Sequence, residues 1–107
     1  MADMHAADFV PMFKAEARDR LRRAVEYVLA LQRNPSAPGA VEECRREMHT
    51  VKGAAGMVGL SAIAQQARAL EEVLARLGTG TEPLTPALLQ RILTEIQELV
   101  EAVEAIG

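Results

Sequence analysis

Residues 48–60 bring together side chains that can carry phosphoryl chemistry. His49 is followed one helical turn later by Lys52, and glycines stand at Gly53 and Gly56. A neutral imidazole nitrogen is a nucleophile at physiological pH and can take a phosphoryl group from ATP or from an aspartyl phosphate. Lys52 would offset charge on the phosphoryl oxygens. Because phosphoryl transfer needs mainly positioning and electrostatics, this set is sufficient for a phosphoacceptor.

The same segment is predicted to be helical, which places the two glycines on the face of His49. Apolar residues recur at alternating spacings of three and four, which predicts one buried stripe. The stripe consists of Val41, Cys44, Met48, Val51 and Ala55. A glycine inside a helix costs about 1 kcal/mol relative to alanine. We therefore interpret Gly53 and Gly56 as a bare surface over which a partner's active site approaches His49.

Three segments of the chain resemble one protein family. HTVKGAAGMVGL resembles the HxxKG signature of histidine phosphotransfer (HPt) domains, and more narrowly the phosphoacceptor domain of CheA-type chemotaxis histidine kinases. FVPMFKAEARDRLRRAVEYVLAL resembles the first helix of that family, with Phe13, Glu16 and Ala17 near its F..EA pattern. LSAIAQQARALEEVLARL resembles its third helix. The likeness covers most of the chain.

The resemblance implies a role for each matching residue. His49 is the phosphoacceptor, Lys52 the cation beside the phosphoryl group and Gly53 the clearance position. Glu71 is the third-helix carboxylate that accepts a hydrogen bond from the ring nitrogen that does not react. Kinase-type members often carry a second histidine one turn before this glutamate, where the present chain has Arg68. No proton relay through a second histidine is therefore expected.

His49 and Glu71 also have simpler interpretations. An isolated histidine on a helix is usually a surface residue without a chemical role, but Lys52 and the glycines on its face favour the functional interpretation. Glu71, like Glu72, would simply be solvated if the second and third helices packed in another register.

Four further residues are candidates for contact with a partner protein. Met57 and Leu60 follow the glycines, and they either belong to the core, which we favour, or form an apolar docking patch for a response-regulator receiver domain. Arg45 and Arg68 are charged candidates for the same docking surface.

The composition predicts a small helical domain. The chain has 107 residues, of which 50% are hydrophobic and only 3% aromatic. This length favours one domain, residues 1–107, and leaves no room for an ATP-binding catalytic domain as well. We therefore expect a protein substrate and not an enzyme.

The pattern of apolar residues and breakers predicts an all-α antiparallel up-down four-helix bundle. The helices are expected at about residues 7–33, 40–58, 61–77 and 86–105. Pro35 ends the first helix, while Gly59 and Gly78 close the second and third. Thr85 is the expected N-cap of the fourth, with Pro86 at its first position.

Several other functions are excluded by charge and spacing. The net charge of −3 opposes binding to nucleic acid, and we interpret the arginines at positions 18, 20, 22 and 23 as a solvated helix face. No apolar run reaches the roughly 20 residues that span a bilayer, and the first residues do not resemble a signal peptide, so no membrane contact and a cytoplasmic location are expected.

No metal or other cofactor is expected either. The second histidine, His5, is far from His49 along the chain, and the glycine spacing fits no nucleotide-binding loop. Cys44 lies on the apolar stripe and is expected to be a buried structural thiol.

These observations lead to one main expectation. The chain is a phosphotransfer module of a bacterial two-component system or phosphorelay, in which His49 receives a phosphoryl group from a histidine kinase ATP-binding domain and passes it to a receiver-domain aspartate. The narrower resemblance implies the N-terminal domain of a CheA-like kinase. The alternative is a structural or adaptor helical bundle without phosphate chemistry.

Overall fold

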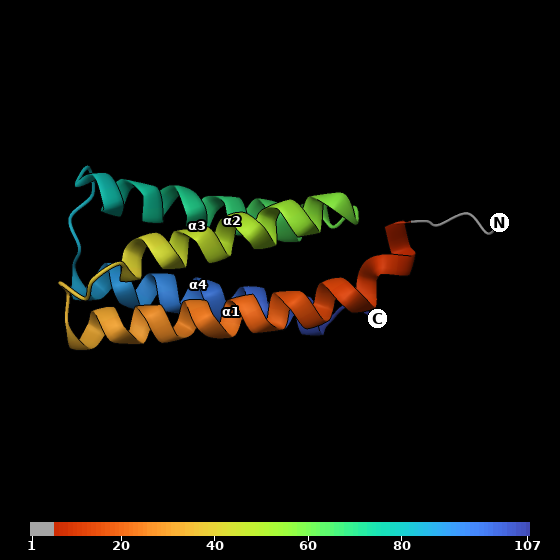
Figure 1. Cartoon of the computed structure of the whole chain (residues 1–107), viewed down its shortest axis with the longest axis horizontal. Helices are drawn as coiled ribbons and strands as arrows, with labels where there is room; N and C mark the ends of the chain where they lie inside the picture. The colour runs from red at the N-terminus through yellow and green to blue at the C-terminus, as the bar shows by residue number, and fades with distance from the viewer. Residues whose placement is uncertain (1–5) are drawn as a thin grey trace.

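Four α-helices form the molecule in the computed structural model, which describes residues 6–107 (Figure 1). A short 3-10 helix, η1 (Ala6–Phe9), leads into α1 (Val10–Arg33). The others are α2 (Ala40–Met57), α3 (Ser61–Thr79) and α4 (Pro86–Glu104). Successive helices run in opposite directions, and the described residues contain no strand. The predicted all-α, up-down four-helix bundle is confirmed.

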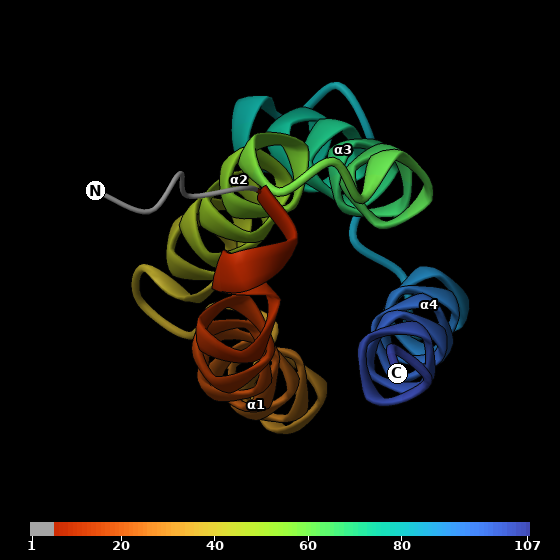
Figure 2. The ribbon, with the colours of Figure 1, turned by 90° about the vertical axis from the view of Figure 1, so that its right-hand side faces the viewer.

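The helices follow one another around the bundle in chain order, and α4 returns beside α1 (Figure 2). Packing contacts join α1 with α2, α2 with α3, α3 with α4 and α1 with α4. The contact between α2 and α3 is the most extensive of these. The helix that carries His49 is therefore held between α1 on one side and α3 on the other.

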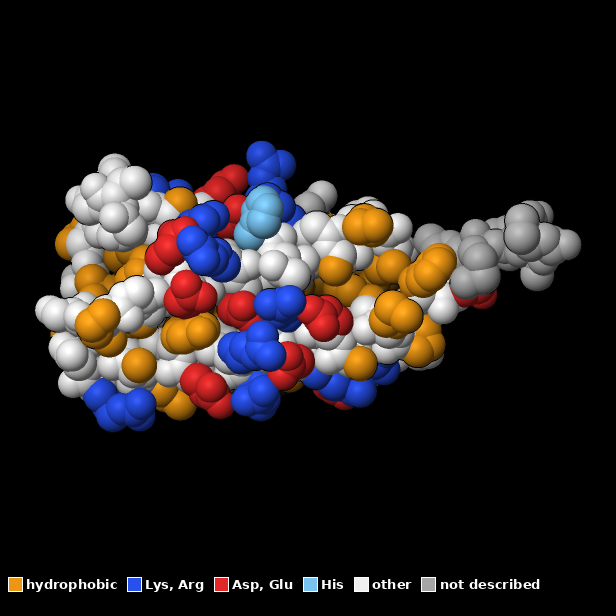
Figure 3. Space-filling view, in the orientation of Figure 1, with side chains coloured by type: hydrophobic (Ala, Val, Ile, Leu, Met, Phe, Trp, Pro, Cys, Tyr) orange, Lys and Arg blue, Asp and Glu red, His pale blue; other side chains and the backbone are white. Residues whose placement is uncertain are grey.

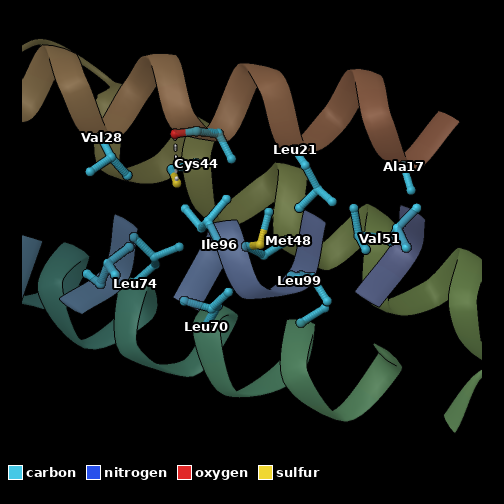
Figure 4. Packing of buried hydrophobic residues seen from close by; sticks show 14 of the residues in the cluster. Ala17, Leu21, Val28, Cys44, Met48, Val51, Leu70, Leu74, Ile96 and Leu99 are labelled. Carbon is cyan, nitrogen blue, oxygen red and sulfur yellow. Dashed lines mark hydrogen bonds between the residues drawn. The ribbon is translucent and has the colours of Figure 1, made fainter. Parts of the chain in front are cut away.

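Each helix contributes one apolar stripe to a continuous core (Figure 4). Leu21, Met48, Leu70 and Ile96, one from each helix, are at most 1% exposed. Cys44 lies among them, and its thiol donates a weak hydrogen bond to the carbonyl oxygen of Ala24, with 3.8 Å between sulfur and oxygen. Burial raises the pKa of the Cys44 thiol to about 12. The prediction of a buried thiol is confirmed.

Three predicted helix ends are found in the structure. Asn34, before Pro35, is extended and ends α1, as expected for a residue that precedes proline. Gly59 ends α2 with a φ of 79°, a left-handed conformation that favours glycine. The hydroxyl oxygen of Thr85 accepts a hydrogen bond from the backbone N–H of Leu88 at 3.1 Å and caps α4.

Two predicted ends were wrong. The first α-helix begins at Val10 and not near residue 7, because Pro11 lacks an N–H and is accommodated in the first helical turn, after the separate turn η1. The third helix passes through Gly78 and ends at Thr79, where Gly80 takes the left-handed conformation with a φ of 77°. Gly78 thus has no terminating role.

The described residues also bear on two expected absences. Among residues 6–107, none of the helices combines the length and hydrophobicity that crossing a bilayer requires. In the same part of the chain, no three His, Cys, Asp or Glu side chains are grouped so that they would hold a metal ion. His5 lies outside the described residues.

Candidate functional site

His49 stands on the solvent face of α2, between the buried residues Met48 and Val51. Met48, the preceding residue, is fully buried, and Val51 is 1% exposed. The His49 side chain is 62% exposed. The helical period of 3.6 residues produces this contrast, since the apolar stripe faces the core and the ring points away from it.

Glu71 of α3 reaches across to the His49 ring. The Nδ1 atom of His49 lies 2.8 Å from Oε1 of Glu71. An ionised carboxylate only accepts hydrogen bonds, so Nδ1 carries the proton and donates it to this contact. In the neutral ring, Nε2 then keeps a free electron pair, on a side chain that is largely exposed. The structure thus brings together the two residues that the resemblance paired.

Lys52 forms an ion pair with the same Glu71 carboxylate. Its Nζ atom is 2.7 Å from Oε2 of Glu71, while His49 occupies Oε1. Burial of the Glu71 side chain, which is 15% exposed, acts to raise its pKa. The contacts with Lys52 and His49 outweigh burial, so the pKa of Glu71 lies below its usual value of 4.5. Glu71 is therefore ionised at neutral pH.

Arg45 adds a second cation to this group. Its Nη1 atom lies 3.7 Å from Oε1 of Glu71, the oxygen that His49 contacts. The same guanidinium donates two hydrogen bonds to Glu42, at 2.9 and 2.7 Å. The hydrogen bonds from Arg45 lower the pKa of Glu42 to about 2. Sequence reasoning missed Glu42, although its spacing of three residues from Arg45 indicates such a pair.

The two glycines of the His49 face have no packing role inside the chain. A Cβ atom added to Gly53 or to Gly56 would have no atom of another part of the protein within 4 Å. Both residues are helical, and neither has a positive φ. The fold would therefore accept alanine at either position, and no contact among the described residues requires glycine there.

An apolar groove lies on the α1 side of the same surface. It is lined mainly by Phe9 and Met12 near the start of α1 and by Ala54, Met57 and Val58 at the end of α2. Met57 is 84% exposed, so the favoured assignment of this residue to the core was wrong. Figure 3 shows the histidine with charged side chains on one side and, beyond a stretch of white surface, hydrophobic side chains on the other.

The remaining candidates occupy different surroundings. Leu60 is only partly buried and packs against the core at the end of α2, where its N–H donates to the carbonyl oxygen of Ala55 at 2.9 Å. Arg68 is exposed and pairs with Glu72 at 3.2 Å. The ion pairs of the described residues do not connect Arg68 with His49 or Glu71.

Comparison with known proteins identifies the family. Residues 8–106 match the model of the Hpt domain, so the chain belongs to the Hpt family of histidine phosphotransfer domains, which act with kinases and receiver domains in two-component signalling. The structure is similar to the CheA phosphotransferase domain from Thermotoga maritima, with a TM-score of 0.85 and 26% identity over 95% of this chain and 96% of that domain.

The chain is also similar to a designed protein and to part of a much longer natural protein. A computationally redesigned four-helix bundle is also similar, with a TM-score of 0.85 over 91% of this chain and 95% of the redesigned chain. Because the two sequences are only 12% identical, this similarity supports the fold and not a function. The gliding motility regulatory protein of Myxococcus xanthus is 42% identical over 91 residues, which cover 80% of this chain. The chain spans only 12% of the length of that relative.

Proposed function

We propose that His49 accepts a phosphoryl group from the ATP-binding domain of a histidine kinase and passes it to an aspartate of a receiver domain. One observation carries this proposal. Glu71 holds Nδ1 of His49 at 2.8 Å, which leaves Nε2 as the free nucleophile on an exposed ring beside the bare surface of Gly53 and Gly56.

The first transfer follows from this arrangement. The electron pair of Nε2 attacks the γ-phosphorus of ATP, the N–P bond forms, and the bond to the leaving oxygen of ADP breaks. The ring still carries its Nδ1 proton and so becomes positively charged. The carboxylate of Glu71 stabilises this charge, and it also fixes the tautomer that can react.

In the second transfer the electron pair moves in the opposite direction, and the hydrogen bond between His49 and Glu71 is kept. A receiver aspartate attacks the phosphorus, the N–P bond breaks, and the electron pair returns to Nε2. Because the proton stays on Nδ1, which donates it in a hydrogen bond to Glu71, the group that leaves is a neutral imidazole. Neither step requires a proton to pass through a second histidine, which agrees with Arg68 at the position where related kinases often carry one.

We also propose that the chain works as the phosphoacceptor domain of a CheA-like kinase. Support comes from the 26% identity and nearly complete overlap with the CheA domain from Thermotoga maritima. The relative from Myxococcus xanthus is much longer than this chain, as expected if the catalytic and receiver parts lie elsewhere in such proteins. In this proposal the domain itself is a substrate and has no ATP-binding site.

The apolar groove is the proposed docking surface for the receiver domain. Met57 follows His49 by eight residues, which is about 12 Å along a helix, a distance that one protein interface spans easily. Phe9, Met12 and Met57 are large and exposed, and such patches are typical of protein interfaces. Leu60 and Arg68 do not line this groove, so they form no part of the proposed docking surface.

The test is a two-step transfer assay. The chain is incubated with a CheA-type catalytic domain and ATP labelled at the γ-phosphate, and then with candidate receiver domains. We expect an acid-labile label on the chain, as for an N–P bond, that moves to a receiver. Failure to acquire a label, or an acid-stable one, would favour the alternative of a structural or adaptor bundle.

A second assay tests the docking surface. Met57→Gln replaces an exposed apolar side chain with a polar one of similar length, and we expect slower transfer to the receiver while acceptance from the catalytic domain is unchanged. If both steps keep their rates, the groove is not the receiver surface.

A further inference from the structure

The site holds two cations for one carboxylate. Lys52 lies 2.7 Å from Oε2 of Glu71, and Arg45 lies 3.7 Å from Oε1. On α2, Arg45 stands four positions before His49 and Lys52 three positions after it. All three therefore lie on the surface that faces α3. Glu71 is thus bracketed by positive charge at both oxygens.

A phosphoryl group on His49 changes the charges that Lys52, Arg45 and Glu71 have to balance. The group adds negative charge at Nε2, while the ring becomes positive and depends more strongly on Glu71. A cation is then needed at the phosphoryl oxygens, and the carboxylate must stay in place. If Lys52 were the only cation on Glu71, its shift toward the phosphoryl group would leave the carboxylate held by the ring alone.

The two cations are anchored differently. Arg45 is tied to Glu42 by two hydrogen bonds of 2.9 and 2.7 Å, which fix the planar guanidinium beside α3. Lys52 is a single ammonium on a flexible stem, and the described residues give it no carboxylate partner besides Glu71. Lys52 is therefore the cation that is free to move, and Arg45 is the one that stays.

We propose that Arg45 is a positioning residue that keeps Glu71 on the His49 ring while Lys52 shifts to the phosphoryl group. This proposal rests on the proposed function and deepens it. It gives Arg45 a place inside the site, in addition to the docking contact expected from the sequence. Arg45 itself does not touch the reacting atoms, because Glu42 holds its guanidinium.

The experiment compares two neighbouring arginines. Arg45→Gln removes the cation at Glu71. Arg46→Gln makes the same change of charge one position later, where the ion pairs of the described residues join the side chain to Glu42 and Glu43, at 3.5 and 3.6 Å, and not to Glu71. We expect Arg45→Gln to slow phosphorylation of His49 about fivefold, which corresponds to about 1 kcal/mol in the barrier. Arg46→Gln should change the rate by less than about twofold.

A conservative variant and an NMR measurement separate positioning from a general loss of charge. Arg45→Lys keeps the charge without the planar fork and should restore part of the rate. In the phosphorylated protein, the Nδ1 proton of His49 should exchange with water several-fold faster in Arg45→Gln than in the wild type, since Glu71 is then less firmly held. Equal rates and equal exchange in Arg45→Gln and Arg46→Gln would overturn the proposal.

A measurement without phosphate keeps this inference separate from the proposed function. The fraction of unphosphorylated His49 that carries its proton on Nδ1 is read by ¹⁵N NMR in Arg45→Gln, in Lys52→Gln and in the double variant. We expect small changes in each single variant and a larger, non-additive loss in the double variant, because either cation suffices to hold Glu71. Additive changes would refute Arg45 as the second holder. An unlabelled wild-type chain would refute the phosphotransfer function instead.

Discussion

The two faces of α2 differ in how far their residues are in contact with the rest of the protein. On the inner face, Met48 and Ala55 are fully buried, and the core of four helices surrounds them. On the outer face, His49 is largely exposed, and a Cβ atom added to Gly53 or Gly56 would meet nothing within 4 Å. The inner face therefore determines stability, and the outer face is available for chemistry. Removing a side chain from one face should leave the property of the other face nearly unchanged.

The largest expected effect is the loss of all phosphorylation in His49→Gln. Glutamine has no nucleophilic nitrogen, so no N–P bond can form at this position. Because the ring is exposed, the free energy of unfolding should change by no more than about 0.5 kcal/mol. Label incorporation and urea unfolding followed by circular dichroism measure the two properties. A variant that still acquires the label would show that another residue is the acceptor.

Met48→Ala should lower stability and leave the phosphoacceptor itself in place, the opposite of His49→Gln, although Met48 is the immediate neighbour of His49. Removal of a fully buried methionine side chain leaves a cavity, and we expect a loss of about 2–5 kcal/mol in the free energy of unfolding. Met57→Ala is the matched control, since Met57 is 84% exposed and its truncation should leave stability almost unchanged. Equal destabilisation of the two variants would contradict the assignment of faces.

The inner face could be predicted from the sequence, because burial repeats with the helical period. Apolar spacing located all four helices, and Pro35 and Thr85 marked two of their ends. The start of α1 was missed because Pro11 fits the first turn of a helix as well as it breaks an interior. Met57 was misplaced because an apolar side chain near the end of a helix does not reveal whether a neighbour covers it.

The outer face could be predicted only in part. The pairing of His49 with Glu71 came from the family resemblance, and the contact is present at 2.8 Å. The partner of Lys52 depends on how α2 and α3 pack, which spacing along one helix does not determine. For this reason the ion pair between Lys52 and Glu71, and the approach of Arg45 to the same carboxylate, became visible only in the structure.

Glu71 links the two helices of the site, and its substitution should have an intermediate effect. Glu71→Gln keeps an acceptor for the Nδ1 proton but loses the charge, whereas Glu71→Ala loses both. We expect the rate of His49 phosphorylation to fall in the order wild type, Gln, Ala, with a loss of about tenfold in Ala, or about 1.4 kcal/mol in the barrier. Rates equal to the wild type in Glu71→Ala would remove Glu71 from the site.

The stability of the same variants should depend on pH in a defined direction. The pKa of Glu71 is lowered in the folded chain, so its ionised form stabilises the fold. This contribution is present above the usual carboxyl pKa and is lost as the pH falls through the lowered folded value. The wild type should therefore lose more stability than Glu71→Gln on acidification from pH 7 to about pH 3. A difference between the two proteins that does not vary with pH would contradict this.

The smallest expected effects concern the glycines, and they test whether the outer face is kept bare for a partner. Gly53→Ala and Gly56→Ala should each raise the free energy of unfolding by about 0.5–1 kcal/mol, because both positions are helical and an added Cβ meets nothing. Transfer should nevertheless slow by a few-fold, since the methyl group stands where the partner's active site approaches and small misplacements are costly in phosphoryl transfer.

Gly78→Ala supplies the control that separates helix stability from clearance. Gly78 lies inside α3, and an added Cβ would be in ordinary contact with Cγ1 of Val41 at 3.9 Å. This variant should also stabilise the fold, but its position near the far end of α3 keeps it away from His49. If Gly78→Ala slows transfer as much as Gly53→Ala, added rigidity and not obstruction is the cause. If only Gly53→Ala and Gly56→Ala slow transfer, the stability lost to these two glycines is explained by access to His49.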